Sequence, residues 1–175
     1  MRMLAFAISV LFGGTALAQS PYAGMQTRPI KALSEQQIAD LKAGRGMGLA
    51  LPAELNGYPG PSHLLELADK LDLSAAQRDR IKQLFDSMKA EAVPIGTKLI
   101  EQETGLDQQF ASRSITSDRL QTATAEIGAT QAALRNTHLK YHLETAQILS
   151  GDQMRQYTML RGYADNAPMQ HRHKH

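Results

Sequence analysis

Apolar residues recur at every third or fourth position over two long stretches of the chain, which is the spacing that places them on one face of a helix. This pattern predicts long helices over residues 75–111 and 117–149. Shorter stretches with the same spacing predict helices over residues 34–43, 63–71 and 151–163. Since helix-favouring residues are plentiful and aromatic residues are few, we expect an all-α protein.

A proline interrupts the first long helix. Pro94 lacks the N–H for a helical hydrogen bond, its ring presses against the carbonyl of Ala90, and Gly96 weakens the same region. We therefore predict a bend near residue 90. Because only residues 112–116 separate the two long helices, they are expected to pair as an antiparallel hairpin. A lone hairpin leaves apolar grooves uncovered, so either a homodimer covers them or another molecule binds there.

The chain before this hairpin has a different character. Residues 44–61 contain five glycines and three prolines, so this segment cannot be regular structure throughout, and we interpret it as extended and lying on the surface. Residues 19–61 are accordingly interpreted as a flexible leader with one short helix and this Gly/Pro-rich segment. Residues 62–164 form the helical domain, and residues 165–175 form a polar tail rich in histidine.

The first 18 residues have the organisation of a secretory signal peptide. Arg2 precedes an apolar run over residues 3–12, which is too short to span a bilayer, and Ala16-Leu17-Ala18 fits the signal peptidase site. We predict cleavage after Ala18; an uncleaved membrane anchor is the alternative. No cysteine follows the site, so a lipoprotein anchor is excluded and the mature chain is expected to be soluble in the periplasm.

Composition narrows the function classes. One of the 19 Lys and Arg residues lies in the signal, so the mature chain keeps 18 against 17 Asp and Glu, which argues against nucleic acid as a partner. The absence of cysteine excludes disulfides and thiol chemistry. No nucleophile motif, phosphate-binding loop or HExxH motif is present, so we do not expect an enzyme.

The sequence Leu-Ser-x-x-Gln occurs three times, at residues 33–37, 73–77 and 149–153. Each copy predicts a capping box, in which the Ser hydroxyl accepts the backbone N–H of the Gln and the Gln side chain accepts the N–H of the Ser. All three copies are therefore expected to start helices. Helix capping alone is sufficient to explain them, so their physics does not by itself imply a function.

The second and third copies lie at the starts of the long first helix and of the last helix, with the residues Leu73, Ser74, Gln77, Leu149, Ser150 and Gln153. This arrangement resembles the Spy/CpxP family of periplasmic stress proteins, whose signature is two LTxxQ-type motifs at these places; here Ser replaces the usual Thr. The resemblance covers about residues 62–163 and includes the signal peptide, the cysteine-free composition and the proline in the hairpin. It implies a cradle-shaped homodimer of bent helical hairpins that holds unfolding clients without ATP. Relatives also include metal-responsive proteins resembling ZraP and the periplasmic parts of nickel and cobalt sensors.

Histidines raise the question of a metal. His138 and His142 are four residues apart on the second long helix, so both imidazoles lie on one face and could share a metal ion. Asp86, His63 or Glu66 from neighbouring helices would have to complete such a site. The alternative is that His138 is half-buried in the core and His142 is hydrogen-bonded beside it.

The C-terminal tail holds the other histidine group. His171, His173 and His175 alternate with Arg172 and Lys174, and neutral imidazoles could bind Zn²⁺, Cu²⁺ or Ni²⁺ there. The positive neighbours oppose this, and a solvated basic tail is the alternative. The scattered methionines form no MxxM-type copper cluster, and we interpret those near the helices as adaptable packing residues.

The leading interpretation is an ATP-independent periplasmic chaperone or envelope-stress accessory protein that binds unfolded or misfolded envelope proteins and requires no cofactor. Its apolar surface would be ringed by basic residues, for which the candidates are Lys82, Lys89, Lys98, Arg119, Arg135 and Lys140. The alternative is a periplasmic sensor or resistance protein for a heavy metal, Zn, Ni, Co or Cu. A third interpretation is an adaptor whose groove binds one partner, such as the periplasmic domain of a sensor kinase.

Overall fold

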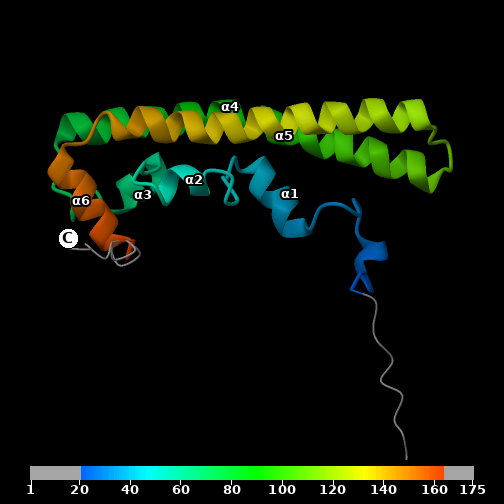
Figure 1. Ribbon diagram of the computed structural model, residues 1–175, viewed down its shortest axis with the longest axis horizontal. Coiled ribbons are helices and arrows are strands. Elements are labelled where there is room, and N and C mark those ends of the chain that lie inside the picture. Colours follow the sequence, from blue (N-terminus) through cyan, green and yellow to red (C-terminus); the bar gives the residue numbers. More distant parts are fainter. Residues whose placement is uncertain (1–20, 164–175) are drawn as a thin grey trace, which may run out of the picture.

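The computed structural model describes residues 21–163, and this part of the chain is helical without any strand (Figure 1). In chain order its elements are η1 (Met25–Thr27), α1 (Glu35–Lys42), α2 (Leu51–Glu54), α3 (Pro61–Glu66), α4 (Ala75–Ala111), α5 (Ser117–Ala146) and α6 (Gly151–Leu160). The prediction of an all-α protein is confirmed. Within residues 21–163, none of the helices combines the length and the apolar character needed to cross a membrane.

The two long helices, α4 and α5, lie side by side, with their connecting turn at one end (Figure 1). The predicted first helix is confirmed at both ends. The second stops at Ala146, three residues earlier than predicted, because residues 147–149 turn before α6 begins. Each helix buries a single stripe toward the other parts of the protein, with Ile81, Leu84, Met88, Ala92 and Leu99 on α4 and Ile127, Leu134, His138 and Tyr141 on α5.

Pro94 does not end α4, which continues through it to Ala111. Ala90, whose carbonyl loses its helical donor, and Pro94 are both exposed, so water can satisfy that carbonyl. Gly96 has a role that the sequence did not reveal. It is buried under α1, and a Cβ there would lie 2.6 Å from the carbonyl oxygen of Leu41. The glycine therefore allows the backbones of α1 and α4 to approach each other directly.

The segment before α3 packs more closely than expected. Residues 44–61 are not an extended surface segment, because they form turns and the short helix α2, and Ala50, Ala53 and Glu54 are buried. Apolar side chains of the preceding residues, Ile30, Leu33 and Leu41, join one core cluster with α4 and α5. The burial of these groups holds the segment against the long helices.

The helix predicted over residues 63–71 is placed differently. It begins at Pro61, since a proline at the first helical position leaves no N–H unsatisfied, and its last regular residue is Glu66. Turns then lead to Ser74. A second core cluster forms here, where Leu64, Leu71, Leu73, Ile81 and Tyr157 pack together.

The connected end of α4 and α5 has no core of its own. From residue 104 to residue 126 no side chain is buried, and the last buried residues before this end are Glu103 and Ile127. The core is therefore confined to the part of the α4–α5 pair against which the other elements pack.

Candidate functional site

All three Leu-Ser-x-x-Gln elements form the predicted capping boxes. At the start of α4 the N–H of Gln77 donates to Ser74 Oγ at 3.2 Å, and the N–H of Ser74 donates to Gln77 Oε1 at 3.0 Å. The same two hydrogen bonds form between Ser150 and Gln153 at 3.2 and 3.0 Å. The expectation that each element starts a helix is confirmed.

The second and third elements also bind each other. Gln77 Nε2 donates to Gln153 Oε1 at 2.9 Å, and Gln153 Nε2 donates to Gln77 Oε1 at 3.1 Å. The two amides further donate to the carbonyls of Ile148 and Leu71, at 2.9 and 3.3 Å. The paired amides therefore join the starts of α4 and α6, a contact that the spacing within either motif could not reveal.

Glu54, at the end of α2, is a buried carboxylate on which several elements converge. Its Oε1 accepts hydrogen bonds from the hydroxyls of Tyr157 and Tyr163, the latter at 3.1 Å. His63 Nδ1 lies 3.3 Å and Arg161 Nε 3.5 Å from the same oxygen. Glu54 is 4 % exposed, so these groups replace most of its contact with water. Sequence reasoning missed it because it lies in the Gly/Pro-rich segment.

The second carboxylate oxygen of Glu54 faces α5. Oε2 accepts the N–H of Gly60 at 3.3 Å and lies 3.8 Å from Nδ1 of His142. That nitrogen is also 2.6 Å from the carbonyl oxygen of Tyr58. Because a carbonyl only accepts, Nδ1 of His142 carries a proton and donates it to this oxygen.

The charge of Glu54 is stable over a wide pH range. Burial opposes its ionised form, but hydrogen bonds from His63 and Tyr157 outweigh burial and lower the pKa of Glu54 to about 2. Burial, and next the hydrogen bond to Glu54, raises the pKa of Tyr157, so its hydroxyl stays a donor. Glu54 therefore anchors α2, α3 and α6 as an anion.

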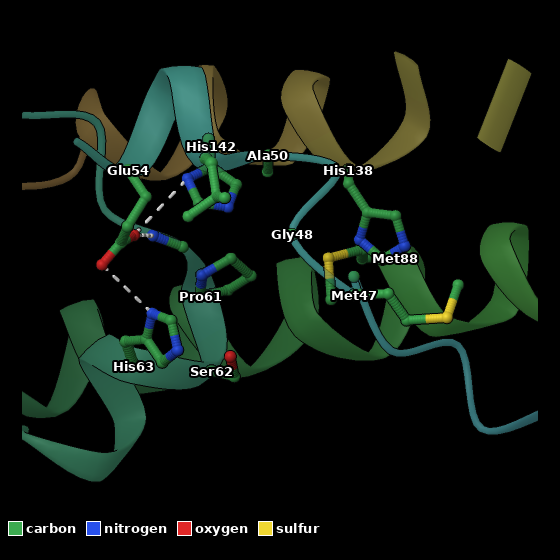
Figure 2. Close-up of a pocket in the computed structure, with 13 residues that line it drawn as sticks. Met47, Gly48, Ala50, Glu54, Pro61, Ser62, His63, Met88, His138 and His142 are labelled. Carbon is green, nitrogen blue, oxygen red and sulfur yellow. Dashed lines mark hydrogen bonds and ion pairs between the residues drawn. The ribbon is translucent and has the colours of Figure 1, made fainter. Parts of the chain in front are cut away.

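A cavity of about 220 Å³ lies beside this anchor, between the segment from Gly46 to His63 and the two long helices (Figure 2). Three of the predicted metal ligands, His63, His138 and His142, line it together. Asp86 does not line it: it is exposed and pairs with Lys82, with 2.6 Å between Oδ2 and Nζ. The other lining residues include Met47, Gly48, Leu51, Glu54, Gly60, Pro61 and Met88.

His138 is 2 % exposed and its Nε2 is buried without a hydrogen-bond partner within the described chain. Burial, and next the nearby His142, lowers the pKa of His138, so the imidazole is neutral. Residues 21–163 contain no group of three or more His, Cys, Asp or Glu side chains arranged to hold a metal ion. The tail histidines His171, His173 and His175 lie outside the described residues, as does the expected signal peptide.

Comparison with known proteins finds no matching family model, no similar curated protein and no similar solved structure.

Proposed function

We propose that this protein is an ATP-independent periplasmic chaperone or envelope-stress accessory protein that binds non-native proteins. The observation that carries the proposal is the exposure of large apolar side chains beside the packed core. Leu51 and Leu55 on α2 are 51 % and 58 % exposed, and Leu143 on α5, which α2 contacts, is 52 % exposed. Where such side chains form a contiguous patch, they mark a surface that binds other proteins. Binding of this type needs neither a catalytic residue nor a cofactor.

The resemblance to the Spy/CpxP family supports two further parts of the proposal. We propose that the α4–α5 pair acts as a bent antiparallel hairpin and that two chains form a cradle-shaped homodimer. Sedimentation equilibrium on the mature chain tests this: a mass of one chain at all concentrations would refute the dimer.

The signal peptide expected over residues 1–18 supports export, and N-terminal sequencing of the exported protein should begin at Gln19.

Electrostatics contributes less to this proposal than the sequence led us to expect. Lys82 pairs with Asp86, and Lys140 Nζ lies 2.8 Å from Glu91 Oε2, so two of the candidate basic residues already have acidic partners. Exposed ion pairs of this type are weak and can exchange partners. We therefore assign the main attraction for clients to apolar contact and a secondary one to charge.

Light scattering tests client binding directly. A chemically unfolded client protein is diluted with and without the mature protein, and aggregation is followed over time. The pair Leu51→Ser and Leu55→Ser should weaken suppression, whereas Leu120→Ser, which removes an exposed leucine near the connected end of α4 and α5, is the matched control. Absence of suppression by the parent protein at stoichiometric amounts would refute the proposed function.

A second candidate function is a periplasmic heavy-metal sensor or resistance protein for Zn, Ni, Co or Cu. The specific observation in its favour is that His63, His138 and His142 line one cavity. Calorimetric titration of the intact mature chain, and of variants in which either the cavity histidines or the tail histidines are changed, measures this directly. Binding that vanishes with the tail alone would exclude the cavity as the site.

A sensor kinase domain as a single partner is a third proposal, which pull-down from envelope extracts would test.

A further inference from the structure

We propose that the cavity beside Glu54 binds one soft monovalent cation, Cu⁺, through the imidazoles of His138 and His142 and the thioether of Met88. The inference rests on the second function proposed above, and it specifies both the metal and its ligands. It differs from the site expected from the sequence, because a methionine replaces the carboxylates Asp86 and Glu66.

His138 provides the first argument. Its ring is nearly fully buried and lines the cavity, yet its Nε2 has no hydrogen bond within the described residues. A buried polar group without a partner costs about 1–3 kcal/mol, and almost all such groups in proteins are paired with protein, water or an ion. A neutral imidazole beside a cavity gains such a partner when a cation binds to its lone pair.

His142 lies one helical turn further along α5, so its ring faces the same cavity as that of His138 (Figure 2). Its Nδ1 donates to the Tyr58 carbonyl, with 2.6 Å between nitrogen and oxygen, so Nε2 is the ring nitrogen left to bind a metal ion. A hydrogen bond from one ring nitrogen to a backbone carbonyl is how proteins orient histidines that bind metals through the other nitrogen.

Met88 supplies the third ligand from α4. Its side chain is 6 % exposed and lines the cavity, and in the view of Figure 2 its sulfur is drawn beside the ring of His138. Met47, on the loop that closes the cavity, adds a second thioether at its exposed rim. Two methionines that are far apart in the sequence thus line the same cavity as the imidazole pair.

The chemistry and charge of the histidine and methionine donors determine which metal ion the cavity prefers. The one carboxylate that lines the cavity, Glu54, is already bound by Tyr157, Tyr163 and Gly60. The free donors are therefore imidazoles, which suit Cu, Zn and Ni alike, and thioethers, whose soft sulfur favours Cu⁺. The cost of moving an ion out of water rises with the square of its charge, so a site without a free anion favours a monovalent ion further.

Competition for Cu⁺ against a coloured chelator tests the inference. The mature chain, kept under ascorbate without oxygen, is titrated with the Cu⁺ complex of bathocuproine disulfonate. We expect one Cu⁺ per chain in the cavity, and a loss of affinity of about tenfold or more in Met88→Leu. Met159→Leu, which changes an exposed methionine on α6, is the matched control and should bind as the parent does. Met88→Leu nearly conserves volume, so circular dichroism should show an intact fold.

Two further measurements make the outcome decisive. A full chain with His171, His173 and His175 changed to Gln should keep the tight site, and loss of Cu⁺ binding in that variant would overturn the inference. In the parent protein, Ag⁺ should shift the methyl resonance of Met88 but not that of Met159. Unchanged Cu⁺ affinity in Met88→Leu would also overturn it. If Zn²⁺ or Ni²⁺ binds in the cavity and Cu⁺ does not, the inference fails while the metal function stands; client binding is measured separately by light scattering.

Discussion

The paired amides of Gln77 and Gln153 give the sharpest test of how this fold is held together. Gln77→Ala removes the hydrogen bond to the N–H of Ser74, the bond to the carbonyl of Ile148 and both bonds to Gln153. At about 1 kcal/mol for each neutral hydrogen bond, and with water replacing part of the loss at this half-buried site, we expect a loss of about 3 kcal/mol in the free energy of unfolding.

The first copy of the motif is a built-in control. Gln37 makes the same bond to the N–H of its capping serine, Ser34, at 2.8 Å, but it has no amide partner from another helix within residues 21–163. Gln37→Ala should therefore cost about 1 kcal/mol, the ordinary value of a cap. Urea unfolding of the mature chain, followed by circular dichroism, measures both losses.

A double-mutant cycle isolates the contact between the two motifs. Gln77→Ala and Gln153→Ala together should cost less than the sum of the single losses, with a coupling of about 1 kcal/mol. Equal losses for Gln77→Ala and Gln37→Ala, or strict additivity of Gln77→Ala and Gln153→Ala, would refute the reasoning. In either case capping alone would explain the motif.

Three further predictions follow from the packing and from Glu54. Gly96→Ala forces a methyl group against the backbone of α1 and should lower the free energy of unfolding by about 2 kcal/mol, whereas Gly105→Ala, with open space around it, should raise it by about 0.5–1 kcal/mol; thermal unfolding distinguishes them. The pKa of Glu54 is about 2 in the folded protein against 4.5 ordinarily, so the unfolded chain binds the proton more readily. The parent should therefore lose about 3 kcal/mol of stability as pH falls from 4.5 to 2. Glu54→Gln has no carboxylate to protonate at this position, so it should not show this loss in acid titrations followed by circular dichroism. Tyr157→Phe removes one donor to Glu54 and so raises the folded-state pKa of Glu54 toward its ordinary value; the loss of stability in acid should therefore be smaller than in the parent, which the same titration records.

The sequence was most informative where a contact is local. Helical spacing located α4 to the residue, and the serine and glutamine of each motif are three positions apart, so both partners of each capping box are visible in the sequence. The bounds of α3 differ from the prediction because Pro61 starts the helix before the apolar pattern begins.

The parts of the site that were missed depend on contacts between distant residues. Glu54 binds Tyr157, which is 103 positions further along the chain, and it lies in a segment whose glycines and prolines indicated only irregular structure. Met88 fits the apolar stripe of α4, so nothing in its spacing distinguishes a core residue from one that lines a cavity. Conversely, Asp86 has the right chemistry for a metal ligand but faces solvent beside Lys82.

The absence of buried side chains between residues 104 and 126 has a consequence for the exchange of amide hydrogens. Opening that end of the α4–α5 pair exposes little apolar surface, so its amides should exchange with deuterium by local fraying, long before those around Ile81 and Leu84. We therefore expect a slowly exchanging body and a connected end whose helices fray locally while the rest stays folded.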